Sequence, residues 1–313
     1  MANMFSSLTN NSRSKKMVIA VAATVALIVV ALLSLAIVSI VNATRNDVPE
    51  DTTPVQNNGI PAGFVTTTFE DNQLYRGNLI LVNDVYSYNA DANANAEWVT
   101  VQNGRISVDG EILYSSNATQ TLVQKEALDA MNEMALAFYE ATGDDYLWVN
   151  VNTDSFYAAG NTFELRYTTA KTEPDNPRRL PISEDATYSW IFTNAYKYGF
   201  VQLFTAPTAN SGETEAVESQ EHIFRYVGKV HAQAMKDKKL ATFEDYLTYL
   251  RDSTSPSRPL SATVDKLSYK VYYIEKDAQQ IIPEKYKDSC VVSGDNMSGF
   301  VVTYCTTATT VKK

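Results

Sequence analysis

The chain has few of the residues on which metal and thiol chemistry depends. Its 313 residues include only two histidines, His222 and His231, and two cysteines, Cys290 and Cys305. It has no Gly-x-Ser-x-Gly elbow, no Ser-x-x-Lys with matching partners, no P-loop and no glycine-rich dinucleotide turn, so nothing points to those catalytic or nucleotide-binding classes. The remaining composition, 45% hydrophobic and 11% aromatic, is that of a folded protein with one large or two small cores.

Basic residues are also scarce, and none of them form a long run. The chain has 26 Lys and Arg against 36 Asp and Glu. Residues 1–45 hold four of the basic residues and none of the acidic ones, so residues 46–313 carry 22 against 36, a formal charge of −14. We expect such a domain to be repelled by nucleic acid and other polyanions, and we predict no nucleic-acid partner.

One long hydrophobic run contrasts with this polar composition. Residues 17–41 are 25 uncharged residues, which as a helix would extend roughly 37 Å against about 30 Å of hydrocarbon. The "VNA" at 41–43 could serve as a signal-peptide cleavage site, but the run is far longer than a signal core of roughly 7 to 15 residues. The sequence therefore favours an uncleaved single-pass membrane anchor.

Flanking charge gives this anchor an orientation. Arg13, Lys15 and Lys16 precede the run and only Arg45 follows it closely, which predicts a cytoplasmic N-terminus, residues 1–16. Residues 42–76, rich in Asn, Thr, Pro and acids, read as an extracytoplasmic linker. A localisation at the cell membrane, with the C-terminal domain outside the cytoplasm, follows.

Secondary-structure signals divide the rest of the chain. "GNLILVN", residues 77–83, predicts a buried strand. Helices are predicted over residues 121–143, 183–199 and 229–238. A fourth follows the "TFED" capping pattern at residues 242–245, in which Thr242 can cap and Asp245 occupies the reciprocal position. These elements assign residues 77–255 to one domain and residues 256–313 to a C-terminal β-hairpin extension.

The two cysteines bracket the predicted hairpin. "VVSGDNMSGFVVTY" joins two β-branched and aromatic stretches through a glycine-rich turn, which places Cys290 and Cys305 about opposite each other. In an oxidising compartment this arrangement predicts a structural disulfide. A redox role or a metal site has less support, because no Cys-x-x-Cys pattern is present.

Several segments together resemble one family. "GNLILVN", "WVNVNTDSF", "WIFTNAYKYGFVQLF", "HIFRYVGKVHAQAM", "FEDYLTYL" and "SGDNMSGFVVT" follow the order of segments in VanY-type D-alanyl-D-alanine carboxypeptidases, over about residues 77–303. The resemblance implies an α+β fold, Hedgehog/D,D-peptidase-like, with a mainly antiparallel sheet and packed helices. It also implies cell-wall chemistry, because the family removes the terminal D-alanine of peptidoglycan stem peptides with one zinc ion.

The family's catalytic residues are missing at the matching positions. Its zinc is held by a His and an Asp of Ser-x-His-x-x-Gly-x-Ala-x-Asp and by the His of Glu-Pro-Trp-His-Phe-Arg-Tyr-Val-Gly, whose Glu is the base. Alignment on "FRYVG" places Gln220 at the base and Ile223 at the zinc ligand. No histidine lies between Trp148 and Trp190, where the strand-like "FELRYTT" at residues 163–169 roughly occupies the place of the first motif. Asp154 stands where the arginine of a Ser-x-Tyr-Arg-Ser segment binds substrate in the family.

The two histidines do not obviously rebuild a zinc site. His231 matches a family histidine that is not a ligand, and His222 is one residue away from the ligand position. On a strand that offset would turn the His222 side chain to the other face, although His222 with Glu221 remains a weak alternative. We therefore expect no catalytic residue to be intact and no metal or other cofactor to be bound.

Three functions remain open. The first is an inactive, membrane-anchored relative of the carboxypeptidases that binds a peptidoglycan stem peptide or a cell-envelope protein. The second is an active D-alanyl-D-alanine carboxypeptidase with relocated zinc ligands. The third is a structural ectodomain for protein assembly, which would bind no peptide.

Overall fold

The computed structural model describes residues 59–108, 110–116, 120–152, 157–203 and 222–307. All the strand pairs of these residues are antiparallel, apart from an isolated parallel bridge between Ser115 and Trp148, and several helices pack on the sheets. The predicted mixed fold with antiparallel sheets is therefore confirmed. The expected span at residues 17–41 lies outside the described ranges, and within them no helix is both long and apolar enough to cross a bilayer.

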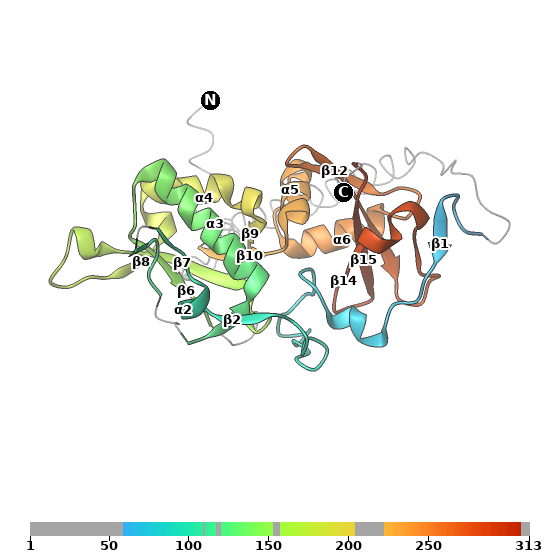
Figure 1. Cartoon of the computed structure of the whole chain (residues 1–313), viewed down its shortest axis with the longest axis horizontal. Helices are drawn as coiled ribbons and strands as arrows, with labels where there is room; N and C mark the ends of the chain where they lie inside the picture. The colour runs from blue at the N-terminus through green and yellow to red at the C-terminus, as the bar shows by residue number, and fades with distance from the viewer. Residues whose placement is uncertain (1–58, 109, 117–119, 153–156, 204–221, 308–313) are drawn as a thin grey trace, which may run out of the picture. The chain divides into compact units, whose positions relative to one another are not determined.

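A five-stranded sheet forms the centre of the first half of the described chain (Figure 1). Its strands are β6 (Leu147–Asn150), β7 (Thr162–Thr168), β10 (Ile223–Tyr226) and β9 (Phe200–Gln202) in that order, with β8 (Arg179–Pro181) also paired to β7. β9 and β10 are held together by the pairs Phe224↔Gln202, Arg225↔Val201 and Tyr226↔Phe200.

Alternation along β7 gives this sheet two different faces. Phe163 and Leu165 are fully buried in the core beneath the helices. Glu164 and Arg166 alternate with them and therefore lie on the opposite face. The predicted strand in "FELRYTT" is confirmed, and its polar residues mark the face on which chemistry could occur.

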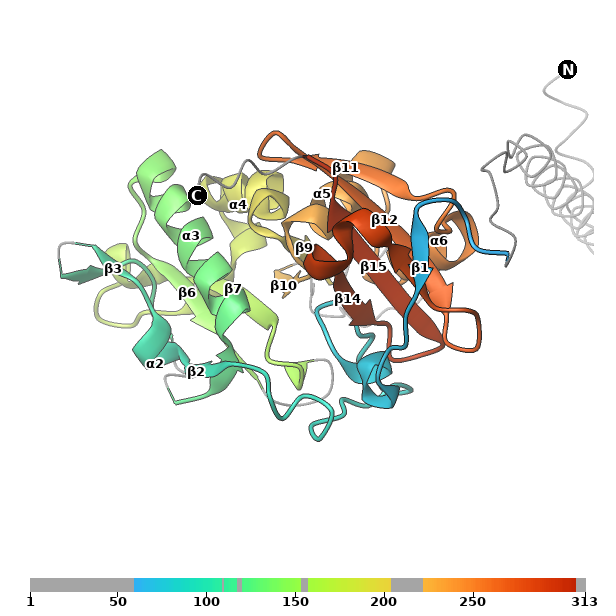
Figure 2. The same cartoon turned by 45° about the vertical axis from the view of Figure 1, so that its right-hand side comes forward.

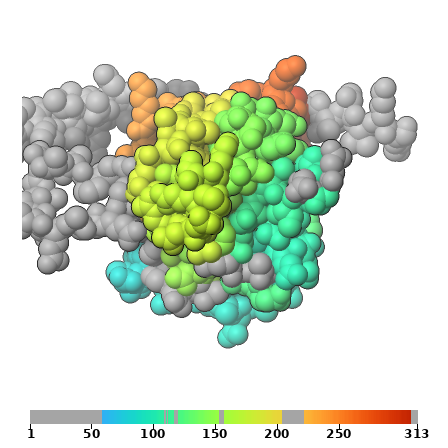
Figure 3. Space-filling view, turned by 90° about the vertical axis from the view of Figure 1, so that its left-hand side faces the viewer, coloured from blue at the N-terminus to red at the C-terminus, as the bar shows by residue number. Residues whose placement is uncertain are grey.

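Helix α3 (Lys125–Thr142) covers the apolar face of the sheet. Leu128, Met131, Ala135 and Phe138 are all buried at helical spacing. The helix ends at Gly143, whose φ of 70° is the left-handed conformation typical of a helix C-terminal cap. Figure 3 shows the surface of this helix, in green, beside that of the yellow-green segment around β8.

The second predicted helix is broken into short pieces. Residues 182–198 form 3₁₀ turns η4 (Ile182–Glu184) and η5 (Ala186–Tyr188), helix α4 (Ser189–Asn194) and 3₁₀ helix η6 (Ala195–Tyr198). Tyr188 stacks between Phe138 and Tyr167, at centroid distances of 5.2 and 5.1 Å. This aromatic packing accompanies the break in the predicted regular helix. The helical segment still ends at Gly199, as expected.

A four-stranded sheet forms the second half. Its order is β11 (Leu260–Val264), β12 (Leu267–Glu275), β15 (Gly299–Cys305) and β14 (Val291–Gly294). Figure 2 shows α5 and α6 beside this sheet and β1 (Phe64–Thr66) at its other side. β1 pairs with β13 (Ile281–Pro283), and 3₁₀ helix η7 (Glu284–Ser289) follows.

Two helices connect the halves, and both were predicted. α5 (Lys229–Lys238) begins after Gly228, and α6 (Phe243–Ser253) begins with the reciprocal capping box of Thr242 and Asp245. Phe243, Tyr246, Leu247 and Leu250 of α6 pack in one core with Val271 and Tyr273 of β12.

The remaining elements are short. They are 3₁₀ helix η1 (Asp71–Tyr75), β2 (Trp98–Thr100) with β5 (Leu122–Gln124), α2 (Val101–Gly104), β3 (Ser107–Val108) with β4 (Glu111–Ile112), and 3₁₀ turn η3 (Thr169–Lys171).

The predicted strand at residues 77–83 is wrong. Leu79, Ile80, Leu81 and Val82 are all buried, as the pattern indicated, but they form no ladder. Their backbone groups pair with the β14–β15 turn instead, for example Leu79 N with Ser293 Oγ at 3.0 Å and Leu81 N with Asp295 O at 2.9 Å. A run of apolar residues usually indicates a strand paired within a sheet. Residues 79–82 are instead buried without a strand partner.

The predicted hairpin is confirmed, but the predicted disulfide is wrong. β14 pairs with β15 in the register Val291↔Thr303, so Cys290 comes opposite Tyr304 rather than Cys305. This offset of one residue turns the two side chains to opposite faces of the sheet. Cys290 packs with Tyr304 on the β1 side, and both cysteines are free.

Candidate functional site: a carboxylate cluster on the central sheet

The polar face of the central sheet brings Glu164 and Ile223 together. They are direct partners in the antiparallel register of β7 and β10, so their side chains lie on the same face. Ile223, the residue aligned with the second zinc histidine, is 4% exposed. An aliphatic side chain at this position fills space and offers no donor atom.

Both carboxylate oxygens of Glu164 accept hydrogen bonds from neighbouring side chains. His222 Nε2 donates to its Oε1 over 3.1 Å, Asn150 Nδ2 donates to its Oε2 over 2.6 Å, and Arg166 Nε also donates to Oε1. The hydrogen bond from His222 is the main cause that lowers the pKa of Glu164 to about 2, with Asn150 and Arg166 adding to it against the opposing effect of burial. The carboxylate is therefore charged at all physiological pH values.

His222 lies in the turn before β10 rather than on the strand. The expected opposite-face orientation does not apply there, and the ring reaches Glu164 while the His222 carbonyl accepts from Leu165 N at 2.8 Å. The side chain is almost completely buried. Its Nδ1 atom is also buried and has no hydrogen-bond partner in the described part of the chain.

Tyr157 also belongs to the group around Glu164, although it was not among the predicted site residues. Ser155, Gly160 and Glu164 have the spacing of the Ser, Gly and Asp in Ser-x-His-x-x-Gly-x-Ala-x-Asp, which assigns Tyr157 to the first zinc histidine and Glu164 to the zinc aspartate. This match is not obvious because tyrosine replaces the motif's histidine, and only the spacing of the other motif residues is retained. Burial, together with the negative charge of Glu164, raises the pKa of Tyr157, so its phenol is neutral.

Gly160 supports this assignment structurally. Its φ is +66°, and a Cβ atom there would lie 2.2 Å from Cζ3 of Trp98. Only glycine fits this turn without displacing the indole ring. The glycine of the motif is therefore required for the approach to β7, even where the neighbouring ligand types have changed.

The shared "FRYVG" segment is framework. Phe224 and Tyr226 are buried in the core beneath α3. Arg225 is fully buried on the other face, where its Nη2 donates to Ile80 O over 2.6 Å and its guanidinium lies 4.8 Å from the Phe243 ring centroid. Burial lowers the pKa of Arg225 to about 10.

His231 lies away from this cluster. Its Nδ1 hydrogen-bonds with the Tyr246 hydroxyl at 2.8 Å, and its Nε2 lies 3.3 Å from Thr303 Oγ1. Packing between α5, α6 and β15 removes the ring from water and lowers its pKa to about 4, so the imidazole is neutral. The residue joins α5 to the C-terminal sheet.

The described residues do not fit the family's zinc ion. Of the three aligned ligand positions, Ile223 has no donor, Tyr157 is a neutral phenol and Glu164 is occupied by three side-chain donors. No group of three or more His, Cys, Asp or Glu side chains able to hold a metal occurs in the described ranges. Gln220, Glu221 and Asp154 lie outside those ranges.

A cavity with a volume of about 790 Å³ lies apart from the Glu164 cluster. Its walls include Tyr226, Lys229 and His231 on one side and Ser293 and Thr303 on the other. Side chains of both charge signs line it, and Tyr226 donates to Glu126 across 2.7 Å within it. Nothing in its lining selects one ligand chemistry.

Comparison with known proteins gives one consistent result. No protein-family model matches the chain. A D-alanyl-D-alanine carboxypeptidase from Enterococcus faecium is 23% identical over 263 residues, which are 80% of this chain and 82% of that protein. Among solved structures, the vancomycin-resistance D,D-dipeptidase VanXYg, crystallised with a D-Ala-D-Ala phosphinate analogue, matches with a TM-score of 0.56 and 18% identity over 77% of this chain and 99% of its own.

A structure of the LD-carboxypeptidase LdcB covers 48% of this chain and 77% of its own at 20% identity, and its TM-score of 0.33 is too low to support an argument. The VanXYg match shows a shared fold, and the carboxypeptidase match extends along most of both sequences. The resemblance seen in the motifs is thus confirmed: in sequence and in fold this chain is similar to the VanY-like D,D-peptidase family.

Proposed function

We propose that the protein is a membrane-anchored, extracytoplasmic relative of the D-alanyl-D-alanine carboxypeptidases that does not hydrolyse peptides. It binds a peptidoglycan stem peptide or acts as a scaffold for a cell-envelope protein. The names of its relatives supply the cell-wall setting, since one is a D-alanyl-D-alanine carboxypeptidase and the other was solved with a D-Ala-D-Ala analogue. Fold likeness alone does not assign an activity, so the site must carry the argument.

The observation that carries the proposal is the pairing of Ile223 with Glu164. Zinc-dependent hydrolysis needs donor atoms around an open coordination position and a carboxylate base for the metal-bound water. Ile223 supplies no donor, and Gln220, aligned with the base, is an amide that does not accept a proton at neutral pH. Arg166 instead forms an ion pair with Glu164 from within the chain, and His222 hydrogen-bonds to the same carboxylate.

The first test is the zinc content of the purified full-length protein after dialysis against trace zinc, together with D-alanine release from a synthetic stem peptide. We expect substoichiometric zinc, no D-alanine release and retained peptide binding. Stoichiometric zinc with D-alanine release would overturn the proposal.

One observation favours the active enzyme as a second candidate. His222 Nε2 and Glu164 Oε1 are only 3.1 Å apart, and both groups are common zinc ligands. Under this alternative, His222→Ala would abolish both zinc binding and D-alanine release, whereas Asn150→Ser would retain the metal. If neither zinc nor peptide is bound, the structural ectodomain becomes the working function.

A further inference from the structure

A small cavity, lined by both apolar and polar residues, lies beside the edge strand of the central sheet. It has a volume of about 280 Å³, near the lower end of the roughly 300 to 1,000 Å³ that ligand pockets span. Its lining comes from α4, η6, β9, β10 and the end of α5. Glu164, His222 and Ile223 are not among the residues that line it, so the cavity is separate from the Glu164 cluster.

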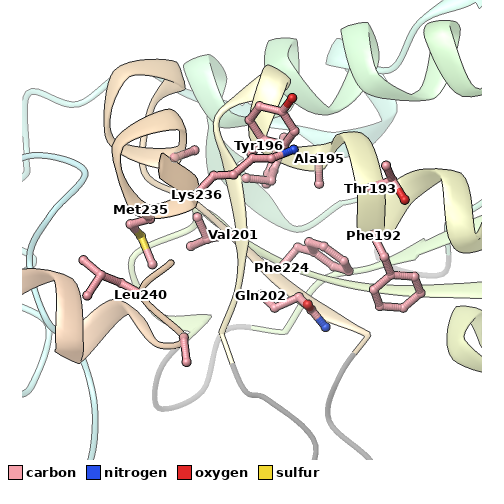
Figure 4. A pocket seen from close by; sticks show the side chains of 13 residues that line it. Phe192, Thr193, Ala195, Tyr196, Val201, Gln202, Phe224, Met235, Lys236 and Leu240 are labelled. Carbon is pink, nitrogen blue, oxygen red and sulfur yellow. The ribbon is translucent and has the colours of Figure 1, made fainter. Parts of the chain in front are cut away.

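The walls of this cavity suit small apolar groups. Figure 4 shows Phe192 and Phe224 on one side and Met235 and Leu240 on the other, with Val201 between them. Thr193 of α4 lies at the exposed rim. The surfaces offered are aromatic and aliphatic, so methyl-sized side chains would be removed from water on entry.

Among the described residues, Lys236 is the only charged one that lines the cavity, and none of those that line it is acidic. Its Nζ lies 3.5 Å from the centroid of the Tyr196 ring, which orients the ammonium group without neutralising it (Figure 4). No carboxylate lies within ion-pair distance of it among the described residues. The ectodomain is otherwise strongly acidic, so an uncompensated cation beside this cavity is unusual here.

Helix stability explains only part of this arrangement. A lysine in the last turn of α5 interacts favourably with the helix dipole, and Lys238 meets that need equally well, with its Nζ 5.4 Å from the Tyr249 ring centroid. Lys238 does not line the cavity. Either lysine can therefore interact favourably with the C-terminus of α5, but only Lys236 lines the cavity.

We propose that this cavity binds the C-terminal end of a short peptide, with its small apolar side chains against Phe224 and Met235 and its terminal carboxylate on the Lys236 ammonium group. A charge-assisted contact beside an apolar wall recognises both features of such a terminus. Its identity as the D-alanyl-D-alanine end of a stem peptide rests on the proposed function, which this inference deepens by naming the binding site.

The test is isothermal titration calorimetry of the purified full-length protein with diacetyl-L-Lys-D-Ala-D-Ala, and with the same peptide as its C-terminal amide. We expect saturable binding of the acid and about tenfold weaker binding of the amide. Lys236→Glu should weaken binding of the acid about tenfold or more, while Lys238→Glu, the matched control on the same helix, should change it by less than about twofold. Thr193→Trp, which places an indole at the rim, should also weaken binding.

The outcomes separate this inference from the proposed function. If the protein binds the acid and neither Lys236→Glu nor Thr193→Trp weakens it, the cavity is not the site, while the peptide-binding function stands. If the unmodified protein binds neither peptide, both the inference and the peptide-binding function are overturned. Equal binding of the acid and the amide would refute the role of the carboxylate. Circular dichroism of each variant checks that the fold is retained.

Discussion

Single residues decide what the central sheet can do. Glu164 occupies the position of a family metal ligand, but His222, Asn150 and Arg166 donate to its oxygens. A cationic guanidinium supplied by the chain thus replaces the charge that a metal ion would bring. Tyr157 and Ile223 fill the two remaining ligand positions with groups that do not coordinate zinc at neutral pH.

If this mapping is correct, the metal site can be rebuilt. We predict that the triple substitution Tyr157→His, Glu164→Asp and Ile223→His produces stoichiometric zinc binding, because the three positions then carry the family's ligands on an unchanged framework. Zinc titration with a chromogenic competitor measures the result. Tyr157→Phe combined with Ile223→Val is the matched control and should bind none. A folded triple variant without zinc would show that these positions do not converge as assigned.

The same cluster predicts an acid dependence of stability. The pKa of Glu164 is lowered to about 2 in the folded chain, below its unfolded value near 4.5, so its contribution is complete above pH 4.5 and is lost as the pH falls through 2. The contribution is about 2 to 3 kcal/mol after allowance for partial exposure.

Urea unfolding of the protein and of Glu164→Gln at several pH values measures this effect. The difference in unfolding free energy between the two proteins should be largest above pH 4.5 and should shrink toward pH 2. A difference that is constant across this range would mean that the carboxylate is not stabilised by its neighbours.

At the scale of elements, the structure differs from the predictions in the pairing and register of segments rather than in their location. The sequence predicted the β14–β15 hairpin, yet a shift of one residue separates the two thiols across the sheet. Likewise, residues 77–83 are as buried as predicted but pair with a turn instead of a strand. Both differences concern the partner of an element rather than its location.

The hairpin register gives a simple prediction. Denatured protein, prepared without reductant from an oxidising compartment, should contain two titratable thiols per chain, and reductant should leave its melting temperature unchanged. Burial raises the pKa of the Cys290 thiol to about 11, so this residue should react with thiol reagents only slowly before unfolding. A single disulfide in mass spectra of the alkylated protein would contradict the register.

At the scale of the whole molecule, two cores share the described chain. One packs beneath α3 on the central sheet, and the other packs α5 and α6 on the C-terminal sheet. β10 leads directly into α5 through Gly228, so the segment resembling the family also joins the two cores. This role accounts for an intact "FRYVG" in a chain whose ligand positions have changed.

The proposed membrane anchoring is tested at the scale of the whole chain. We predict that the full-length protein sediments with membranes, resists extraction by high salt and dissolves in detergent, because residues 17–41 are long and apolar enough to span a bilayer. A version beginning at residue 46 should be released in soluble form. Protease added outside intact cells should digest the C-terminal region but leave a tag at residue 1 intact. Digestion of the N-terminal tag would reverse the orientation.

Capping, periodicity and motif spacing are local properties, so the amino-acid sequence was sufficient to predict the capped helices, the strand β7, the hairpin and the family resemblance. It could have revealed Tyr157 and Glu164 as well, since the Ser155–Gly160–Glu164 spacing was present. Three features became visible only in the folded chain: His222 contacts Glu164, the two cysteines lie on opposite faces of their sheet, and Lys236 lines the cavity beside β9. Those contacts join residues far apart in the chain, and their geometry depends on register and packing that no local pattern encodes.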